Sequence, residues 1–390
     1  MTRDPAWLTD ELDELKREHL FRSRRVVEPV APGHSRVNGQ ELVDFSANDY
    51  LGLARDPRLA KAAEGAPAGA GASPLVSGRS PQYCRLEESL AAFEQTEAAL
   101  LFPSGFAANL GTITALIGPD DAVFSDHRNH ASLIDGCRLC RAQLHIYHHN
   151  SLDQLGRQLA ETADARRRLI ITDGLFSMDG SIAPLAQLSD LAEDFDAMLL
   201  VDEAHATGTL GQSGRGSCEL LGVDQHVTLR IGTLSKAVGA AGGFVAGSRA
   251  LIDYLWHHAR TQVFSTAIPP ATCAAAALGL QLIDEEPQRR HHLAQLGSRL
   301  RQHLTGLQLE TSSEDGPIVP VILGSASAAV EASLLLAQHG HFVPAIRPPS
   351  VPAGTARLRI SLSAAHTDND IDRLVQALEL VSAREVTTHE

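Results

Sequence analysis

Short apolar runs that stop abruptly at a polar residue are the feature of this chain that most restricts its fold. Most are continuous rather than alternating, as in parallel strands buried on both faces of a sheet. Segments with helical patterning, such as Ser151–Thr162 and Leu185–Phe195, lie between them. This alternation favours a doubly wound α/β domain with a mostly parallel sheet. The expected strands are residues 98–102, 122–126, 144–148, 168–173, 198–202, 228–233 and 243–247.

The two ends of the chain are patterned differently from this middle part. A charged helix is expected from Thr9, as its N-cap, to Arg25, followed by an extended arm. Towards the C-terminus, strands over 317–324 and 356–364, a helix ending at Gln338 and a last helix from Asp368 indicate a smaller α+β unit. We therefore expect an N-terminal helix and arm (1–45), a large domain (46–282) and a small C-terminal domain (283–390).

The net charge indicates what kind of molecule the chain can bind, and the cysteines indicate whether it holds a metal. The chain has 390 residues with 33 basic and 47 acidic side chains, for a net charge of -14. Such a chain would repel nucleic acid and anionic membranes, so a small molecule is the expected partner. The N-terminus is too charged for a signal peptide, and no apolar run reaches the roughly 18–20 residues of a membrane helix, which predicts a cytoplasmic protein. Cys137 and Cys140 are expected to share a helix face, with no metal.

The stretch "LLVDEAHATG" places Asp202 at the end of an apolar run and His205 three residues later. The letters "DEAH" also occur in nucleotide-driven motors, which need an upstream phosphate-binding loop containing Gly-Lys. The chain contains no Gly-Lys pair, so that class is excluded. In open α/β sheets, ligands bind beyond the carboxyl ends of the strands. Asp202 is therefore expected at a small-molecule site.

Lys236 follows another buried strand, in "IGTLSKAVGAAGG", and is the only basic residue between Arg230 and Arg249. A lysine among small apolar residues suits Schiff-base chemistry, although a lysine reaching out of a loop to solvent is the ordinary alternative. A carboxylate such as Asp202 can hold the protonated ring nitrogen of pyridoxal phosphate. The two residues together, each at the end of its own strand, predict this cofactor.

Further residues could complete such a site. Ser104-Gly105-Phe106 stands between an expected strand and the start of a helix. In such an arrangement the free backbone N–H groups point at an anion, which suits a phosphate. Thr233 could add a hydroxyl. His205 could bond the phenolic oxygen of the cofactor and His130 could stack on its ring. Each of these residues, taken alone, could equally be an ordinary loop position, as could Ser177.

The linked motifs "FSANDYLGL", "FPSGFAANLG", "NHASLIDG", "FSMDGSIAPL", "VDEAHATGTLG" and "TLSKAVGAAGG" resemble those of the α-oxoamine synthases. These are pyridoxal phosphate enzymes of the fold-type I architecture, with a large doubly wound domain and a smaller α+β domain. The likeness runs in order over nearly the whole chain. Residues 345–366, with Ile346-Arg347-Pro348-Pro349, are most similar to the 8-amino-7-oxononanoate synthase branch. "GAGASPLVSG" and Ser350 depart from the usual forms.

The resemblance implies a decarboxylative condensation of L-alanine with a pimeloyl thioester, carried by coenzyme A or acyl carrier protein, in biotin synthesis. It implies a homodimer with shared active sites, pyridoxal 5'-phosphate as cofactor, and catalytic roles for Lys236, Asp202, His130 and His205. The implied cofactor residues are Gly105, Phe106, His130, Ser177, Asp202, His205, Thr233, Lys236 and Thr266, the last reaching the phosphate of the partner subunit. The implied substrate residues are Arg22, Asn48, His130, Arg347, Ser350 and Arg359, with Arg359 and Asn48 on the carboxylate of alanine.

Two alternatives remain open at this point. One is another α-oxoamine synthase that uses glycine or serine, which the Arg347 region and the preferred amino acid would distinguish. The other is a binding module that kept the fold and lost the chemistry. The joint presence of Lys236, Asp202, His205 and His130 argues against the second.

Overall fold

The chain forms two compact units in a computed structural model that describes residues 5–312 and 314–388. One unit comprises Asp49–Ser177 and Ser181–His291, and the other comprises Met1–Asn48, Met178–Gly180 and His292–Glu390. The N-terminal segment therefore groups with the C-terminal part of the chain. The division predicted from the sequence, at residues 45/46 and 282/283, stays a prediction.

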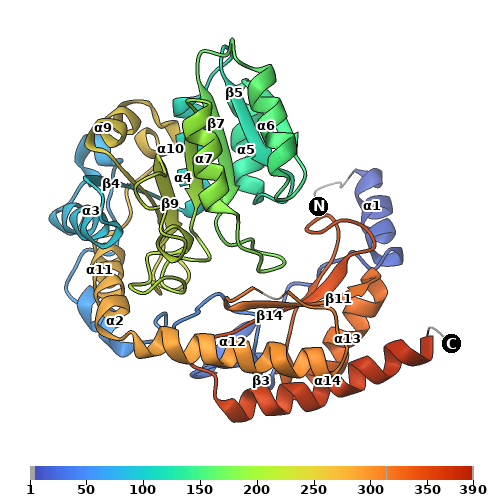
Figure 1. Ribbon diagram of the computed structural model, residues 1–390. Coiled ribbons are helices and arrows are strands. Elements are labelled where there is room, and N and C mark those ends of the chain that lie inside the picture. The colour runs from blue at the N-terminus through green and yellow to red at the C-terminus, as the bar shows by residue number, and fades with distance from the viewer. Residues whose placement is uncertain (1–4, 313, 389–390) are drawn as a thin grey trace. The chain divides into compact units, whose positions relative to one another are not determined.

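The unit of residues 49–291 is built on one seven-stranded sheet with the order β4-β10-β9-β8-β7-β5-β6 (Figure 1). Neighbours from β9 to β6 pair in parallel, whereas β10 runs antiparallel to both β4 and β9. The sheet is thus mostly parallel, as predicted. Its strands are β4 (Ala98–Phe102), β5 (Ala122–Asp126), β6 (Gln143–Tyr147), β7 (Arg168–Asp173), β8 (Met198–Asp202), β9 (Leu229–Thr233) and β10 (Gly243–Gly247).

Helices cover both faces of this sheet because alternate strand residues point to opposite sides. Leu200 joins a core that includes Ile113 of α4 and Leu133 of α5, whereas Leu199 and Val201 join a core with residues of α6 and α7. The continuous apolar runs thus contribute side chains to a hydrophobic core on each face of the sheet. The helices are α2 (Pro57–Ala63), α3 (Pro81–Glu94), α4 (Gly105–Leu116), α5 (Ala131–Cys140), α6 (Leu152–Glu161), α7 (Leu185–Asp194), α8 (Ser217–Leu220), α9 (Arg249–His258), α10 (Arg260–Val263) and α11 (Pro270–Glu285), with a π-helical turn η1 (Pro74–Gly78).

The strand bounds predicted for this sheet agree with the structure to within one residue, whereas the strand predicted over 356–364 in the other unit is observed as Ala356–Ser361. The run expected over 144–148 is β6 at Gln143–Tyr147, whose first residues are exposed because it lies at the edge of the sheet. Cys137 and Cys140 share the helix α5, as predicted, and the structure shows both as buried free thiols. They therefore contribute to the core.

The second unit holds two small sheets, ordered β1-β2-β3-β12 and β11-β14-β13. Its strands are β1 (Val27–Ala31), β2 (His34–Val37), β3 (Gln40–Asp44), β11 (Ile318–Gly324), β12 (His341–Phe342), β13 (Ala345–Ile346) and β14 (Ala356–Ser361). Its helices are α1 (Ala6–Arg17), α13 (Ala326–Gln338) and α14 (Asp368–Thr388), while α12 (Gln288–Gly306) runs across the division between the units.

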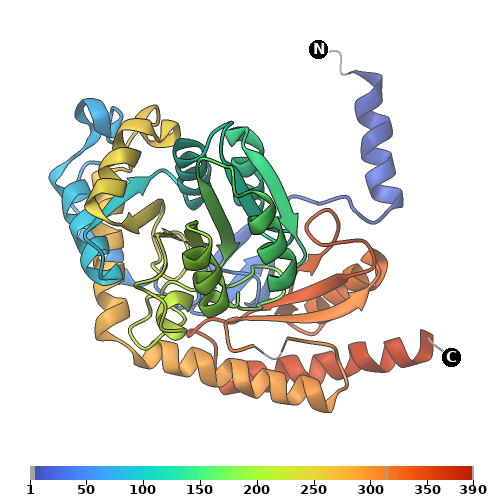
Figure 2. The same cartoon turned by 45° about the horizontal axis from the view of Figure 1, so that its top comes forward.

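The prediction of a helix from Thr9 to Arg25 is wrong at both ends. α1 spans Ala6–Arg17, and its N-cap is Pro5 without a side-chain cap. The helix ends because His19 adopts a left-handed φ of 56°, after which Leu20 and Phe21 donate back to the carbonyl of Leu15. An extended stretch then leads from α1 to β1 (Figure 2).

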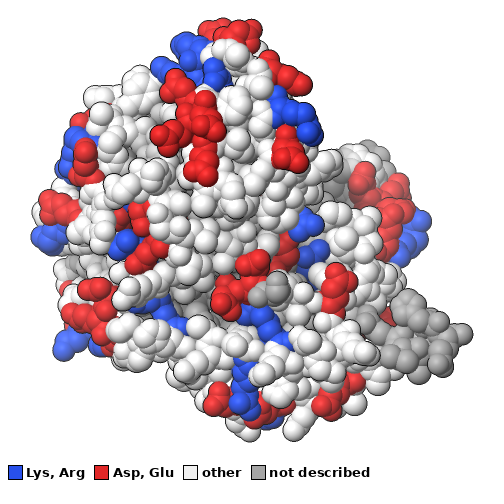
Figure 3. Space-filling model, in the orientation of Figure 1, with Lys and Arg blue, Asp and Glu red and all other residues white. Residues whose placement is uncertain are grey.

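Acidic and basic side chains are interspersed with uncharged ones on the face shown in Figure 3. No broad basic area appears on the part of this face that the structure describes. Among the described residues, no helix is both long enough and apolar enough to span a bilayer.

Candidate active site

Three neighbouring parallel strands, β5, β7 and β8, end on the carboxylates Asp126, Asp173 and Asp202, and all three are buried. Asp173 and Asp202 are direct partners in the pairing of β7 with β8. Burial raises the pKa of the Asp173 carboxyl well above its ordinary range, and the Asp202 carboxylate adds to the rise. Asp126 instead bonds His149, with 3.1 Å between its Oδ2 and Nδ1. A cation bound at this end of the sheet would therefore be stabilised, because it would offset the cost of ionising these closely placed carboxyl groups.

Asp202 is held on both of its carboxylate oxygens. Oδ2 accepts a hydrogen bond from Asn109 Nδ2 at 2.6 Å, and Oδ1 accepts from the backbone N–H of Ala204 at 2.8 Å. Asn109 comes from α4 and is itself buried. The carboxylate thus has a fixed orientation, which suits a partner such as a protonated ring nitrogen.

His205 lies in the turn after β8 and is also fixed. The Tyr50 hydroxyl and His205 Nδ1 are 2.6 Å apart, and both residues are buried. Tyr50 stands in the "FSANDYLGL" motif. It orients the imidazole from the side of Nδ1.

Lys236 follows β9 in a loop that folds back on itself before β10. The loop is closed by hydrogen bonds from Leu234 N to Gly242 O and from Ala240 N to Leu234 O. Lys236 is partly buried, and its charge influences the pKa values of both His130 and Asp173. Its amine therefore lies within electrostatic reach of His130, which the sequence predicted, and of Asp173, which it did not.

The start of α4 meets the end of β9. A Cβ added to Gly105 would lie 3.3 Å from the Cβ of Thr233, so the glycine permits a close approach that a side chain would obstruct. Ser104 caps the helix by accepting from Ala107 N–H, and the N–H groups of Gly105 and Phe106 precede the first backbone bond of the helix. This corner has the features of an anion site. The Thr233 hydroxyl donates to Gly242 O at 2.9 Å, so it would have to rotate to donate to an anion.

His130 caps α5 and remains exposed, with the Phe106 ring edge-on to it at 6.4 Å between centroids. Loss of hydration lowers the pKa of its imidazole, while the Asp202 carboxylate opposes this effect and Lys236 reinforces it. Its backbone N–H donates to Asp173 Oδ2 at 2.7 Å. His130 is therefore brought to the same strand ends as Asp202.

Ser177 is buried after β7, whereas Thr266 is exposed before α11. The roles suggested for these two residues stay predictions.

Apart from His130, the predicted substrate residues lie in the other unit and form two groups. Buried Arg359 of β14 donates from Nη1 to Ser361 Oγ at 2.6 Å and to Asn48 Oδ1 at 3.2 Å. Arg347 donates to the His19 carbonyl, and Arg22 donates to the Pro348 carbonyl at 3.3 Å. Burial lowers the pKa of Arg347, and the nearby charge of Arg22 lowers it further. The partner predicted for Arg359, Asn48, is thus in contact with it, while Ser350 is an exposed residue beside the Arg347 turn.

Sequence reasoning missed the residues that hold the others in place. Asn109, Ser132 and Tyr50 all stand in motifs that were singled out, but their contacts join segments far apart in the chain. Asp173 ends an apolar run just as Asp202 does, and that signal could have identified it.

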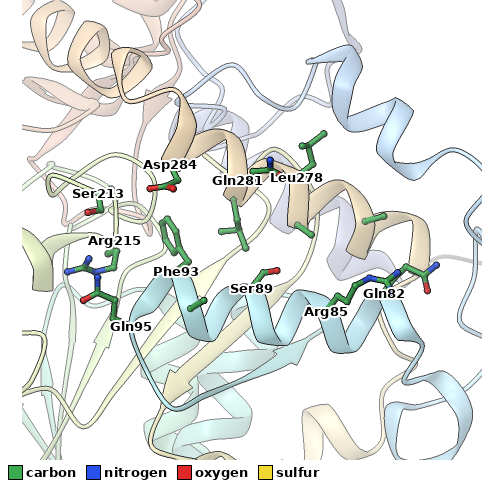
Figure 4. A pocket seen from close by; sticks show the side chains of 14 residues that line it. Gln82, Arg85, Ser89, Phe93, Gln95, Ser213, Arg215, Leu278, Gln281 and Asp284 are labelled. Atoms are coloured by element: carbon green, nitrogen blue, oxygen red, sulfur yellow. The ribbon is translucent and has the colours of Figure 1, made fainter.

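A hollow of about 690 Å³ lies elsewhere, between α3 and α11 (Figure 4). Arg215 and Gln95 stand towards one end of it, and Arg85 and Gln82 towards the other. None of the predicted site residues lines this hollow. The chemistry at the strand ends is thus separate from it.

Comparison with known proteins assigns the chain to a family. A sequence profile described as aminotransferase class I and II matches residues 40–378. The chain belongs to this family. It is 48% identical to an 8-amino-7-oxononanoate synthase of Anaeromyxobacter dehalogenans, over 96% of this chain and 95% of the relative. It is 49% identical to an 8-amino-7-oxononanoate synthase of Alkalilimnicola ehrlichii, over 95% and 96% of the two chains.

Solved structures agree with this assignment. A serine palmitoyltransferase from S. paucimobilis, solved with a bound PLP–myriocin aldimine, superimposes with a TM-score of 0.92 at 29% identity, covering 98% of each chain. The resemblance to the α-oxoamine synthases and the predicted fold-type I architecture are thereby confirmed.

Proposed function

We propose that this protein is a pyridoxal phosphate-dependent 8-amino-7-oxononanoate synthase that acts in biotin synthesis. It condenses L-alanine with a pimeloyl thioester and releases carbon dioxide and the free thiol. The observation that carries the proposal is that the charges of Asp202 and Lys236, which stand at or just after the ends of two neighbouring strands, both act on His130. The names and the 48–49% identity of the relatives support the same activity.

The residues present fit the cofactor. The buried Asp202 carboxylate suits a protonated pyridine nitrogen, and the start of α4 beside Gly105 suits a phosphate. When bound, the cofactor supplies an electron sink for a carbanion at the α-carbon of the amino acid.

Each protein group then has a role in this proposal. Lys236 would hold the cofactor through its amine, and the same amine would take the proton from the α-carbon of alanine. Asp202 would keep the ring nitrogen protonated, and His205 would bond the phenolic oxygen. The Phe106 N–H, Ser177 and Thr233 would contact the cofactor, and His130 would stack on its ring. General acid–base help of this kind is typically worth about 10²–10⁴-fold in rate.

The substrates are assigned to the remaining residues. Arg359, held by Asn48, binds the carboxylate of alanine, because a guanidinium matches a planar carboxylate. Arg347, Arg22 and Ser350 are assigned to the acyl donor. The active unit is proposed to be a cytoplasmic homodimer in which Thr266 reaches the phosphate of the partner subunit.

The second candidate is a related synthase that uses glycine or serine. The close structural similarity to a serine palmitoyltransferase is the observation that favours this second candidate. The relatives named above favour alanine.

A direct assay separates the candidates. The purified protein with pyridoxal phosphate should convert alanine and pimeloyl-CoA, or pimeloyl-acyl carrier protein, into 8-amino-7-oxononanoate detected by mass spectrometry, and Lys236→Ala should not. Borohydride reduction followed by peptide mapping should place the cofactor on Lys236. Product formed only from serine or glycine would favour the second candidate, and a cofactor mapped to another lysine would overturn the site assignment.

A further inference from the structure

A chain of hydrogen bonds runs from Asp202 to His130 through α4 and α5. Asn109 Nδ2 donates to Asp202 Oδ2 at 2.6 Å and to Ser132 Oγ at 2.9 Å. Ser132 Oγ lies 2.7 Å from His130 Nδ1, and the Ser132 backbone N–H donates to the same nitrogen at 3.3 Å. The chain thus links the ring-nitrogen partner of the proposed site to its stacking residue.

The chemistry of the groups fixes the direction of every bond in this chain. An ionised carboxylate only accepts, so the amide nitrogen of Asn109 must face Asp202. Its second hydrogen then occupies one lone pair of Ser132 Oγ, which keeps a second lone pair and its own hydrogen, so the direction of its bond to His130 is decided at Nδ1. A backbone N–H can only donate, so Nδ1 of His130 accepts from the Ser132 backbone and must then also accept from the Ser132 hydroxyl. The ring proton of a neutral His130 must therefore sit on Nε2.

We propose that Asn109 and Ser132 are positioning residues that hold His130 as the neutral tautomer protonated on Nε2, so that Nε2–H can donate a hydrogen bond to a bound substrate. The tautomer follows from the hydrogen bonds alone. Its use toward substrate rests on the proposed function.

Burial makes this chain effective. Ser132 is 0% exposed, Asn109 2% and Asp202 4%, so bulk water cannot replace the bonds. His130 itself is exposed, and among the described residues nothing is hydrogen-bonded to its Nε2. The backbone of His130 is fixed independently by the bond from its N–H to Asp173. The orientation of the imidazole is thus fixed by the hydrogen bonds at Nδ1, which leaves Nε2 able to bind another group.

Protonation of His130 conflicts with the same bonds. An imidazolium carries a proton on both nitrogens, so Nδ1 would lose the hydrogen bonds that it accepts from Ser132. Loss of hydration separately lowers the pKa of His130, which acts in the same direction. Removing the hydroxyl should therefore weaken the preference for one tautomer and raise the pKa of the ring.

The tautomer can be read directly by ¹⁵N NMR, because protonated and unprotonated imidazole nitrogens resonate far apart. The histidine-labelled protein would be measured with and without pyridoxal phosphate, and the His130 signals assigned by their loss in His130→Gln. We expect wild type to show a proton on Nε2 only. Ser132→Ala should give a mixture of tautomers and an upward shift of the titration midpoint, and Ser132→Thr should restore the wild-type spectrum.

Thr112→Val is the matched control, since Thr112 is a buried hydroxyl on α4 whose Oγ1 has no hydrogen-bond partner among the described residues. It should leave the His130 spectrum unchanged. A proton on Nδ1 in wild type, or an unaltered spectrum in Ser132→Ala, overturns the proposal. Should Ser132→Ala not fold, Asn109→Ala removes the group that orients the hydroxyl and carries the same expectation. The measurement needs neither substrate nor turnover, so its outcome is independent of the proposed function.

Discussion

At the scale of single residues, Arg359 shows how a binding group is prepared in advance. Its Nη1 is held by Ser361 and Asn48, and the side chain is buried, so little rotational freedom remains to be lost when a carboxylate binds. A lysine has neither the planar fork nor this pair of restraints.

Arg359→Lys should therefore weaken alanine binding by about 1.5–3 kcal/mol, the range of a hydrogen bond to a charged group. Titration with alanine, followed through the absorbance of the cofactor, measures the effect, and the absorbance without alanine should persist. Arg357→Lys, on the same strand, is the control and should bind alanine normally. Normal binding in Arg359→Lys together with a loss in Arg347→Lys would move the carboxylate anchor to Arg347.

Glu94 is a residue whose burial predicts pH-dependent stability. Its carboxyl is 0% exposed, neither oxygen has a hydrogen-bond partner among the described residues, and Arg230 Nη1 is 3.5 Å away. Burial raises its pKa to about 8 from the usual 4.5. The folded state therefore keeps a proton that the unfolded chain loses, and stability falls as the pH rises from about 4.5 towards 8.

Glu94→Gln should remove this pH dependence, because the amide stays neutral. The gain in unfolding free energy at pH 7 should be at most about 3.5 kcal/mol, from roughly 1.4 kcal/mol per pKa unit between 4.5 and 7. Urea unfolding at pH 5, 7 and 8 for both proteins gives the comparison. Parallel pH profiles would show that Glu94 is ionised in the folded protein.

At the scale of secondary-structure elements, the junction of α4 with β9 offers a test that separates binding from folding. In Gly105→Ala the new Cβ would lie 3.3 Å from Thr233, inside the corner proposed for the phosphate. Alanine is also the better helix former, so the helix itself should not suffer.

Gly105→Ala should lower the affinity for pyridoxal phosphate by roughly tenfold, a loss of about 1.4 kcal/mol, while the melting temperature of the cofactor-free protein stays within a few degrees of wild type. Equilibrium dialysis against the cofactor and thermal unfolding supply the two numbers. Gly118→Ala, where the nearest atom would be 3.9 Å away, is the control. Equal losses of affinity in both variants would contradict the assignment of the phosphate to this corner.

The elements also show what the sequence can predict and what it cannot. Strands such as β7 and β8 were predicted from buried runs that end at Asp173 and Asp202, because two-sided burial demands continuous apolar sequence. The antiparallel direction of β10 depends on its partners β4 and β9, which no local pattern encodes. The end of α1 was missed because no glycine or proline stands at His19, where the chain turns.

The same limit holds for the site. Asp202 and Lys236 could be predicted because each stands just after its own apolar run. The roles of Asn109 and Ser132 depend on how α4 and α5 pack against β8, and only tertiary contacts reveal them.

At the scale of the whole molecule, two buried histidines should make the unit that contains both termini lose stability in acid. Its buried His366 accepts from Ser363 N–H through Nδ1 and lies 3.1 Å from the Asp44 carbonyl through Nε2, contacts that a neutral ring satisfies. Burial lowers the pKa of His366, and likewise of His341, from 6.5 to about 4. The unfolded chain takes up these protons below about pH 6.5 while the folded chain resists until about 4, so stability is lost as the pH falls through this window.

Each of these histidines should lower the free energy of unfolding at pH 4 by at most about 3.5 kcal/mol, from roughly 1.4 kcal/mol per pKa unit between 6.5 and 4. His341→Phe should flatten the fall in urea stability between pH 6.5 and 4, because His341 Nδ1 has no hydrogen-bond partner among the described residues and its ring packs beside Phe45. His366→Phe loses the two hydrogen bonds of that ring, so it should destabilise the protein already at pH 7, by about 1–3 kcal/mol for each group left unsatisfied. Intrinsic fluorescence during urea unfolding at several pH values follows both variants. A His341→Phe profile parallel to wild type would mean that His341 is protonated in the folded protein, and that the acid sensitivity of this unit arises from its carboxylates.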